Sequence, residues 1–301
     1  MYILPSRDAE SYDGIRPISV KRETLGSFIA KVIYFFRRNV RFVLAWRLDL
    51  VMTLLGVGTT TVMWGLLATM VGGGAQSYLN RYGYGGNYFS FLIIGLIAND
   101  YLWIPMQRLY SYLQSHWGTG WLDFMLITPS NPLSVLLGPQ AYSFVLVSVQ
   151  ATIQVLVGYF VFQLRFDPNA NLFALVIIIP MSMIAAIGWG LMSASTFTLI
   201  NAKGGSNPVL WFLTTFTPLL SGVYYTPEIL PNWVEPLGLI LPHTYVIKGL
   251  RKALLSGASL ADLTPEITGL AALSLIILPL GYMIFRWSID KGRRDGTIMP
   301  W

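Results

Sequence analysis

Six apolar runs in this sequence are long enough to cross a lipid bilayer. A crossing helix needs about 20 apolar residues, and hydrocarbon offers its backbone no hydrogen-bond partner outside the helix itself. The runs cover residues 50–71, 88–106, 135–164, 172–200, 208–225 and 267–285. They predict an all-α membrane protein with six transmembrane helices, which together form a domain over residues 48–287.

The composition supports a membrane class and excludes several kinds of site. Of the 301 residues, 54% are hydrophobic and only 11% are charged, whereas a soluble domain carries about 25% charged residues. The sequence has no cysteine and only two histidines, His116 and His243. Disulfides and thiolate metal sites are therefore excluded, and we expect no histidine metal cluster either.

The basic residues indicate how the helices are oriented. Most of the 20 Lys and Arg residues lie before the first run, after the last run, or in the loops that hold Arg108 and Lys203. Because Lys and Arg are retained on the cytoplasmic side, we predict a multi-pass protein of the plasma membrane with both termini cytoplasmic. The polar N-terminal tail covers residues 1–22 and the basic C-terminal tail residues 288–301. The net charge of +6 then reflects topology and anionic lipids, without a nucleic-acid partner.

Residues 23–47 have the pattern of an amphipathic helix ahead of the first run. Their apolar residues recur at helical spacing, while Lys31, Arg38 and Arg41 fall elsewhere around the helix. We predict a helix that lies in the cytoplasmic headgroup layer, because it leads directly into the first membrane span. The alternative is a soluble helix that packs on another subunit.

The segment from Pro208 to Lys252 is apolar but cannot form one continuous helix. Prolines each remove a backbone donor, and glycines loosen the chain further. The breaking residues are Pro218, Gly222, Pro227, Pro231, Pro236, Gly238 and Pro242. Irregular backbone at membrane depth must be buried in protein or line a wet cavity. We therefore predict a re-entrant outer segment at residues 226–243, between the fifth and sixth spans, as found in proteins that move something across a membrane.

Residues 243–256 are expected to form a helix on the outer surface. Lys248, Arg251 and Lys252 lie close together in this stretch. We expect them to bind lipid phosphates, with contact to an anionic cargo as the alternative. Glu228 is expected to cap a helix or to pair with Lys248 or Arg251, with a gating role as the alternative.

The loop over residues 107–134 contains the pattern of a short helix with an apolar face. The stretch over residues 118–129 ends at Pro129, and Trp121, Leu122 and Met125 can share one face. A helix of this kind on the cytoplasmic side suits a docking element for a partner. An ordinary interfacial connector fits the periodicity equally well.

Several catalytic motifs are absent from the sequence. It has no glycine-rich phosphate loop followed by Lys and Ser or Thr, no HExxH metal helix and no GxSxG nucleophile motif. We therefore expect a chain that is not an enzyme and does not itself hydrolyse ATP. The energy for transport would come from a partner or from an ion gradient.

Three motifs in order along the chain resemble those of type-2 ATP-binding-cassette (ABC) transporter permeases. The first runs from Gly118-Thr119 to Thr128-Pro129. The second comprises Ser221-Gly222-Val223-Tyr224-Tyr225, Pro231-x-Trp233, Leu241-Pro242 and Gly249-Leu250-Arg251. The third comprises Phe285-Arg286 and Arg293-Arg294-x-Gly296. With the six spans and the basic N-terminal helix, the resemblance covers residues from about 25 to 298.

The resemblance implies a permease half-transporter without a cofactor of its own. Two copies, or one copy and a related permease, would pair with two cytosolic ABC ATPase subunits that bind ATP and Mg²⁺. The residues implied in coupling to the ATPase are Gly118, Thr119, Leu122, Asp123, Phe124, Leu126, Thr128 and Pro129. The residues implied in the pathway and its outer gate are Gly222, Tyr224, Tyr225, Glu228, Pro231 and Trp233.

A few polar residues fall inside the predicted spans. Asp100 lies near one end of the second run, where it can reach water, and Gln150 and Gln154 lie in the third. Amides inside membranes join helices more often than they bind substrate. We expect a structural or interfacial role for Asp100, with a place in the pathway as the alternative.

These observations favour an ATP-driven exporter of an apolar or amphipathic cargo, such as a drug or a lipid. The cargo would cross by alternating access at a dimer interface, and Leu122, Phe124 and Leu126 would transmit the push of the ATPase. A permease for lipid-linked glycans is the first alternative, and a gradient-driven carrier is the second.

Overall fold

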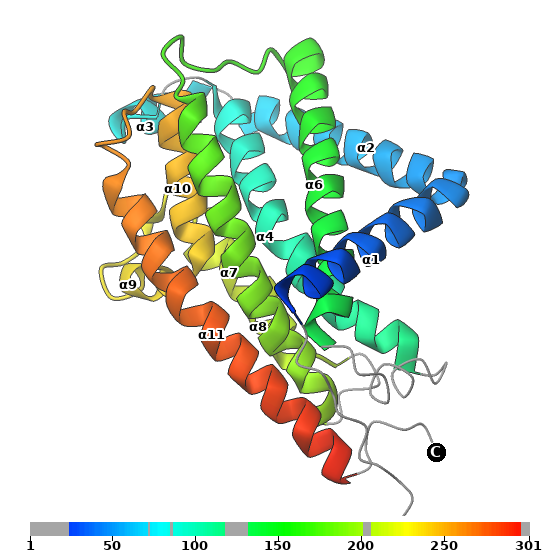
Figure 1. Ribbon diagram of the computed structural model, residues 1–301. Coiled ribbons are helices and arrows are strands. Elements are labelled where there is room, and N and C mark those ends of the chain that lie inside the picture. Colours follow the sequence, from blue (N-terminus) through cyan, green and yellow to red (C-terminus); the bar gives the residue numbers. More distant parts are fainter. Residues whose placement is uncertain (1–23, 72, 85–86, 118–131, 201–205, 296–301) are drawn as a thin grey trace, which may run out of the picture.

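The computed structural model describes residues 24–71, 73–84, 87–117, 132–200 and 206–295 (Figure 1). Within these ranges every regular element is a helix, and none is a strand. The predicted all-α class is therefore confirmed.

The first two helices meet at a sharp turn. α1 (Leu25–Ala45) begins where the side chain of Thr24 accepts a hydrogen bond from the backbone of Ser27, and α2 (Arg47–Val71) follows after the single residue Trp46. No residue of α1 is buried. A helix thus forms over most of residues 23–47, and its place in the headgroup layer stays a prediction.

α1 packs along α6 (Pro132–Phe162), and the two backbones come closest at Gly138. A Cβ atom on Gly138 would lie 2.4 Å from the Cβ of Phe35 and 2.9 Å from the backbone nitrogen of Phe36. Only glycine leaves room for this crossing, so α1 is held against the membrane helices although none of its own residues is fully buried.

In the described part of the chain, five helices are long and apolar enough to cross a membrane. They are α2, α4 (Tyr88–Trp117), α6, α7 (Leu172–Leu199) and α11 (Thr264–Asp295). They correspond to the predicted spans at residues 50–71, 88–106, 135–164, 172–200 and 267–285. Both α4 and α11 extend beyond those limits, and Asp100 lies near the middle of α4 instead of near its end.

The predicted fifth span is wrong in its length. α8 (Pro208–Leu220) has 13 residues, which makes it about 20 Å long, whereas the hydrocarbon core is about 30 Å thick. The helix stops at Leu220 because the chain turns at Ser221 and Gly222. A single continuous helix over residues 208–225 is therefore not formed, and the six-span count stays a prediction.

α7 and α11 lie side by side and run in the same direction (Figure 1). Their backbones meet where a Cβ atom on Gly281 would lie 2.2 Å from the carbonyl oxygen of Gly188. α4 and α10 (Pro242–Leu255) pack on the same group of helices. The buried apolar core runs through these four helices.

Because α7 and α11 are parallel, the chain between them has to return from the end of α7 to the start of α11. It does so through α8, the short helices η2 (Pro227–Ile229) and α9 (Glu235–Gly238), and α10. The predicted irregular region at residues 226–243 thus consists of two short helices and turns. Its insertion into the membrane from the outer side stays a prediction.

α3 (Gly73–Arg81) lies between α2 and α4, at the same end of the molecule as the start of α11 (Figure 1). Its residue Tyr78 shares a hydrogen bond of 3.1 Å with Thr226, on the chain that follows α8. This bond ties the α2–α4 connection to the irregular region.

Candidate functional site

The break after α8 is built into the backbone. Gly222 has a φ angle of +69°, which only glycine adopts without strain. A Cβ atom at this position would also lie 2.6 Å from the ring of Pro227. The chain can therefore leave the helix here. Steric limits on the backbone explain why the motif has a glycine at position 222.

A buried arginine holds this break in place. Arg251 of α10 is 1% exposed. Its Nη1 and Nη2 atoms donate hydrogen bonds of 2.6 Å each to the carbonyl oxygens of Gly222 and Val223, and its Nε donates one of 3.0 Å to Phe91. The guanidinium carbon also lies 3.4 Å from the centre of the Phe91 ring. Gly95 provides the space, because a Cβ atom there would lie 2.2 Å from Nη2.

This arrangement corrects the expectation that Arg251 binds lipid phosphates. A buried cation is costly unless hydrogen bonds compensate it, and here three carbonyl oxygens do so. Neighbouring basic residues of α10 are also engaged: Lys248 pairs with Glu228 at 3.1 Å, and Lys252 pairs with Glu266 at 2.6 Å. The helix is packed inside the protein and not laid on its outer surface.

Aromatic residues cover the break on one side. Trp64 of α2 stacks on Tyr224 with ring centres 5.2 Å apart, and the hydroxyl of Tyr88 donates a hydrogen bond of 3.1 Å to the Tyr224 carbonyl. The hydroxyl of Tyr225 donates to the carbonyl of Leu219. Tyr224 therefore connects α2, α4 and the chain after α8.

The other predicted gate residues lie further along the same connection. The carbonyl of Pro231 accepts hydrogen bonds from the backbones of Val234 and Glu235. The side chain of Trp233 is 76% exposed. The structure places these residues on the short helices and turns between α8 and α10, and their role as a gate stays a prediction.

Outside the membrane helices, burial changes the acidity of Tyr84. This side chain lies in the connection between α3 and α4, and burial raises its pKa to about 12. The phenol thus stays neutral over the physiological range and acts as part of the packing.

The polar residues of α4 and α6 meet inside the helix bundle. Nε2 of Gln154 donates a hydrogen bond of 3.1 Å to the carboxylate of Asp100. Gln150, one turn earlier on α6, is also buried. The bond between Gln154 and Asp100 agrees with the expected structural role, in which an amide joins two helices.

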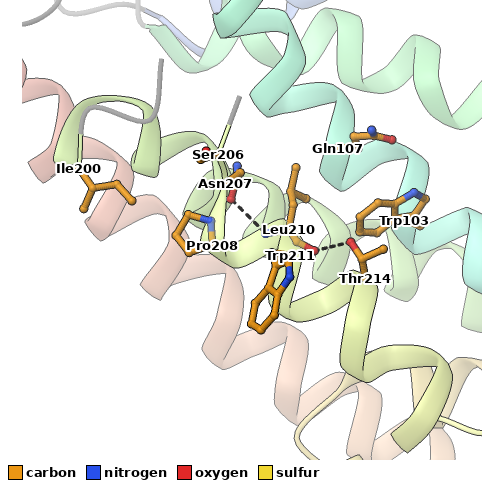
Figure 2. Close-up of a pocket in the computed structure, with 9 residues that line it drawn as sticks. All are labelled: Trp103, Gln107, Ile200, Ser206, Asn207, Pro208, Leu210, Trp211 and Thr214. Carbon is orange, nitrogen blue, oxygen red and sulfur yellow. Dashed lines mark hydrogen bonds between the residues drawn. The ribbon is translucent and has the colours of Figure 1, made fainter. Parts of the chain in front are cut away.

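A pocket of about 670 Å³ opens between α4 and α8, near the start of α8. Its wall combines Trp103 and Gln107 of α4 with residues at the beginning of α8, among them Pro208, Trp211 and Thr214. Figure 2 shows Trp103 on α4 facing Leu210 and Thr214 on α8. The lining combines apolar side chains with the amide and hydroxyl groups of Gln107, Ser206, Asn207 and Thr214.

Asn207 shapes this pocket by starting α8. Its side-chain oxygen accepts a hydrogen bond of 3.0 Å from the backbone of Leu210, while its Nδ2 donates to the backbone and the hydroxyl oxygens of Ser193 on α7. The cap therefore fixes the start of α8 against α7. Asn207 was not predicted as a site residue, although the Asn-Pro pair at residues 207–208 is a signal for a helix cap. Arg251 was predicted to bind lipid phosphates, and its role in holding the break was missed.

The predicted coupling residues, from Gly118 to Pro129, lie outside the described residues. Within the described ranges there is no group of three or more His, Asp or Glu residues that could hold a metal ion.

A scan of family models gives one match, to the ABC-2 type transporter, over residues 31–255. The chain belongs to the ABC-2 type transporter family. The match begins within α1 and ends with α10, so it contains both the break after α8 and the α4–α8 pocket. A search of curated proteins found no match to the sequence.

The ABC-2 type family is a family of transporter membrane components. The match to this family and the five candidate spans identify the chain as a membrane protein and as a transport permease component. ABC-2 type permeases typically pair with ATPase subunits.

Proposed function

We propose that this chain is the membrane-spanning subunit of an ATP-driven exporter in the plasma membrane, with both termini in the cytoplasm. Its cargo would be apolar or amphipathic, such as a drug or a lipid. The observation that carries the proposal is the α4–α8 pocket, because more than half of its lining residues are apolar and the helix α8 that forms one wall ends at a break bonded to Arg251 of α10.

In this proposal the fifth crossing is made in two pieces, α8 and α10. The break between them lies where cargo would leave the protein. Opening it would require the bonds that Arg251 makes to Gly222 and Val223 to be exchanged for others, so these bonds would favour a closed outer end.

A second permease copy, or a related permease, would cover the exposed faces of α2 and α8. In α2 the buried residues are Thr61, Gly65 and Ala68, and its outer side exposes large apolar residues. Trp211 of α8 is 65% exposed. Pairing across these faces would place two α4–α8 pockets next to each other and enclose a path between them.

The energy would come from two cytosolic ABC ATPase subunits that bind ATP and Mg²⁺ and dock on the loop over residues 107–134. Nucleotide can shift the permease between states only by its different affinity for them. The predicted contact through Leu122, Phe124 and Leu126 would transmit this difference to α4 and α6, which lie on either side of the loop.

The first test is co-purification of the tagged chain from its native membrane in mild detergent. We expect an ABC ATPase in equal amount, identified by mass spectrometry and by ATP hydrolysis. A well-behaved preparation without any ATPase would overturn the proposal in favour of a gradient-driven carrier.

A second test addresses the coupling. Leu126→Asp should leave insertion and ATPase binding measurable but abolish transport in vesicles, because a charge replaces an apolar contact. Leu126→Met serves as the matched control and should transport normally. Unchanged transport by Leu126→Asp would show that this residue transmits nothing.

A permease for lipid-linked glycans is the second candidate. Trp103 and Trp211 favour it, because indole rings also suit the stacking of sugar rings. Substitution of both by leucine separates the candidates: glycan export should fail, whereas export of an apolar cargo should continue.

A further inference from the structure

A second pocket, of about 700 Å³, lies between α1, α4 and α6. Its polar lining includes Arg38 and Asn39 of α1 and Gln107, Arg108 and Ser111 of α4. It lies on the part of α4 that leads into the predicted cytoplasmic loop over residues 107–134. Neither the sequence prediction nor the proposed pathway makes use of this pocket.

Two arginines from different helices meet at this pocket. Nη2 of Arg38 donates a hydrogen bond of 3.2 Å to the hydroxyl of Tyr112, and its guanidinium carbon lies 5.4 Å from the centre of the Phe35 ring. The guanidinium carbon of Arg108 lies 5.8 Å from the centre of the Tyr142 ring. These contacts with aromatic residues of α1, α4 and α6 hold both guanidinium groups at the pocket wall.

The guanidinium groups in the pocket lining suit an anion. Asp49, at the start of α2, is also part of its lining, and both Asp49 and Arg108 lie close enough to Tyr142 to act on it electrostatically. Asp49 does not neutralise Arg108 directly, since Arg108 has no carboxylate within ion-pair distance in the described part of the chain. Guanidinium groups match the oxygens of a phosphate, and two of them line this pocket from different helices.

The apolar walls indicate that this anion belongs to an amphiphile. Phe42 and Val43 of α1, Ile104 of α4 and Pro139 of α6 complete the lining. α1 also exposes large apolar residues beside the pocket, with Phe42 63% and Trp46 62% exposed. A phosphate with an attached apolar chain can use both surfaces, whereas free phosphate can use only the polar one.

Gln107 connects this pocket to the α4–α8 pocket, because its side chain lines both. Along α4, Trp103 and Gln107 belong to the first pocket, and Ile104, Gln107 and Arg108 belong to the second. The two pockets therefore open on adjacent faces of one helix. Gln107 would then be the residue that separates a headgroup bound at the arginines from the α4–α8 pocket.

We propose that the pocket between Arg38 and Arg108 binds the phosphate headgroup of an anionic amphiphile that enters from the cytoplasmic leaflet. This inference rests on the proposed export function where it names the cargo class. The headgroup can belong either to the cargo or to a resident membrane lipid, and the two are separated by experiment.

The binding test uses the purified full-length chain in detergent, without any ATPase. Phosphatidylglycerol and phosphatidylcholine are added in turn, and bound lipid is counted by native mass spectrometry. We expect phosphatidylglycerol to bind more tightly, and Arg38→Gln and Arg108→Gln each to weaken that binding about tenfold, because each removes one charge-assisted contact.

Arg41→Gln is the matched control. It removes the same charge from the same helix, but Arg41 is exposed and does not line the pocket. Its affinity should stay within about twofold of the unchanged chain. Equal binding of the two lipids would overturn the proposal, because binding would then not depend on the charge of the headgroup. An equal loss in Arg41→Gln would overturn it in favour of general surface charge. Competition by millimolar inorganic phosphate would overturn the amphiphile part.

The cargo is tested separately, in vesicles that contain the chain with its ATPase and fluorescent phosphatidylglycerol. ATP-driven translocation that both arginine variants abolish supports the cargo assignment. Binding without translocation overturns that assignment and leaves a resident lipid. Since the binding test needs no ATPase, its failure is distinguishable from a failure of the proposed export function.

Discussion

α2 and α10 show opposite relations between hydropathy and burial. α2 is a long apolar helix, yet only three of its 25 residues are buried. α10 is shorter and carries His243, Lys248, Arg251 and Lys252, yet eleven of its 14 residues are buried. The more polar helix is therefore the one that lies inside the protein.

The difference shows that hydropathy predicts contact with lipid and not burial by protein. Apolar side chains are equally stable against lipid tails and against other helices, so α2 can remain at the surface. A polar helix has no such freedom, because its charged groups need specific partners. Arg251 finds these partners in backbone carbonyls that the break after α8 leaves available.

The largest effect is expected from removing the buried charge. Arg251→Met should lower the free energy of unfolding by about 3 kcal/mol or more, because it leaves the carbonyls of Gly222, Val223 and Phe91 without donors. Unfolding in detergent, followed by tryptophan fluorescence, measures the change. Arg165→Met removes an exposed arginine and should change little. Equal stability of both variants would mean that the guanidinium does not hold the break.

A smaller loss is expected from Gly222→Ala. The φ angle of +69° and the contact with Pro227 together should cost about 1–3 kcal/mol. Gly83→Ala is the matched control, because Gly83 has a φ angle of +78° but no atom within 4 Å of an added Cβ. The same unfolding assay should show the smaller loss for Gly83→Ala, and the reverse order would contradict a crowded turn at Gly222.

Two glycines test whether the surface of α2 is open. Gly65→Leu should cost about 1–3 kcal/mol by overpacking, since a Cβ atom there would lie 2.3 Å from the ring of Phe162. Gly56→Leu should change the stability of the isolated chain by less than about 0.5 kcal/mol, since no atom lies within 4 Å. The same substitution is then measured in the assembled transporter. If Gly56→Leu lowers the stability there but not in the isolated chain, a second subunit covers this part of α2.

The smallest effect is expected at the ion pair of α10. The side chains of Lys248 and Glu228 are 18% and 32% exposed, so Glu228→Gln should cost at most about 1 kcal/mol. A double-mutant cycle with Lys248→Met measures the coupling, which should fall as salt is added because exposed charges are screened. A coupling energy that is large and independent of salt would contradict this expectation, and would mean that the pair is shielded from water as Arg251 is.

Much of the fold could be predicted because it depends on local patterns. Five of the six predicted spans form helices, since an apolar run of sufficient length is enough to specify one. The fifth failed at its end because the apolar run continues through Val223, while the helix stops at Leu220, two residues before Gly222 with its positive φ angle. The apolar side chains beyond Leu220 favoured a longer helix, although Gly222 and the prolines that follow it had indicated a break.

The candidate site was less predictable because it depends on contacts between distant segments. Sequence reasoning placed Arg251 at the surface, because basic residues are usually solvated. Its partners Phe91 and Gly222 lie 160 and 29 residues away in the chain, and no local pattern shows that they meet. The bond between Gln154 and Asp100 was likewise absent from any motif, although both residues had been singled out as polar groups inside spans.

The contact of Gly188 with Gly281 has a mechanical consequence. Two parallel helices whose backbones are in contact cannot slide past each other without first separating. We therefore expect α7 and α11 to move as one rigid unit. α1 and α2 have few buried residues and are joined by the single residue Trp46, so we expect them to move more easily than α7 and α11. A force applied from the cytoplasm would then change the angle between α6 and α7. The α7–α11 pair would stay fixed while the other helices move relative to it.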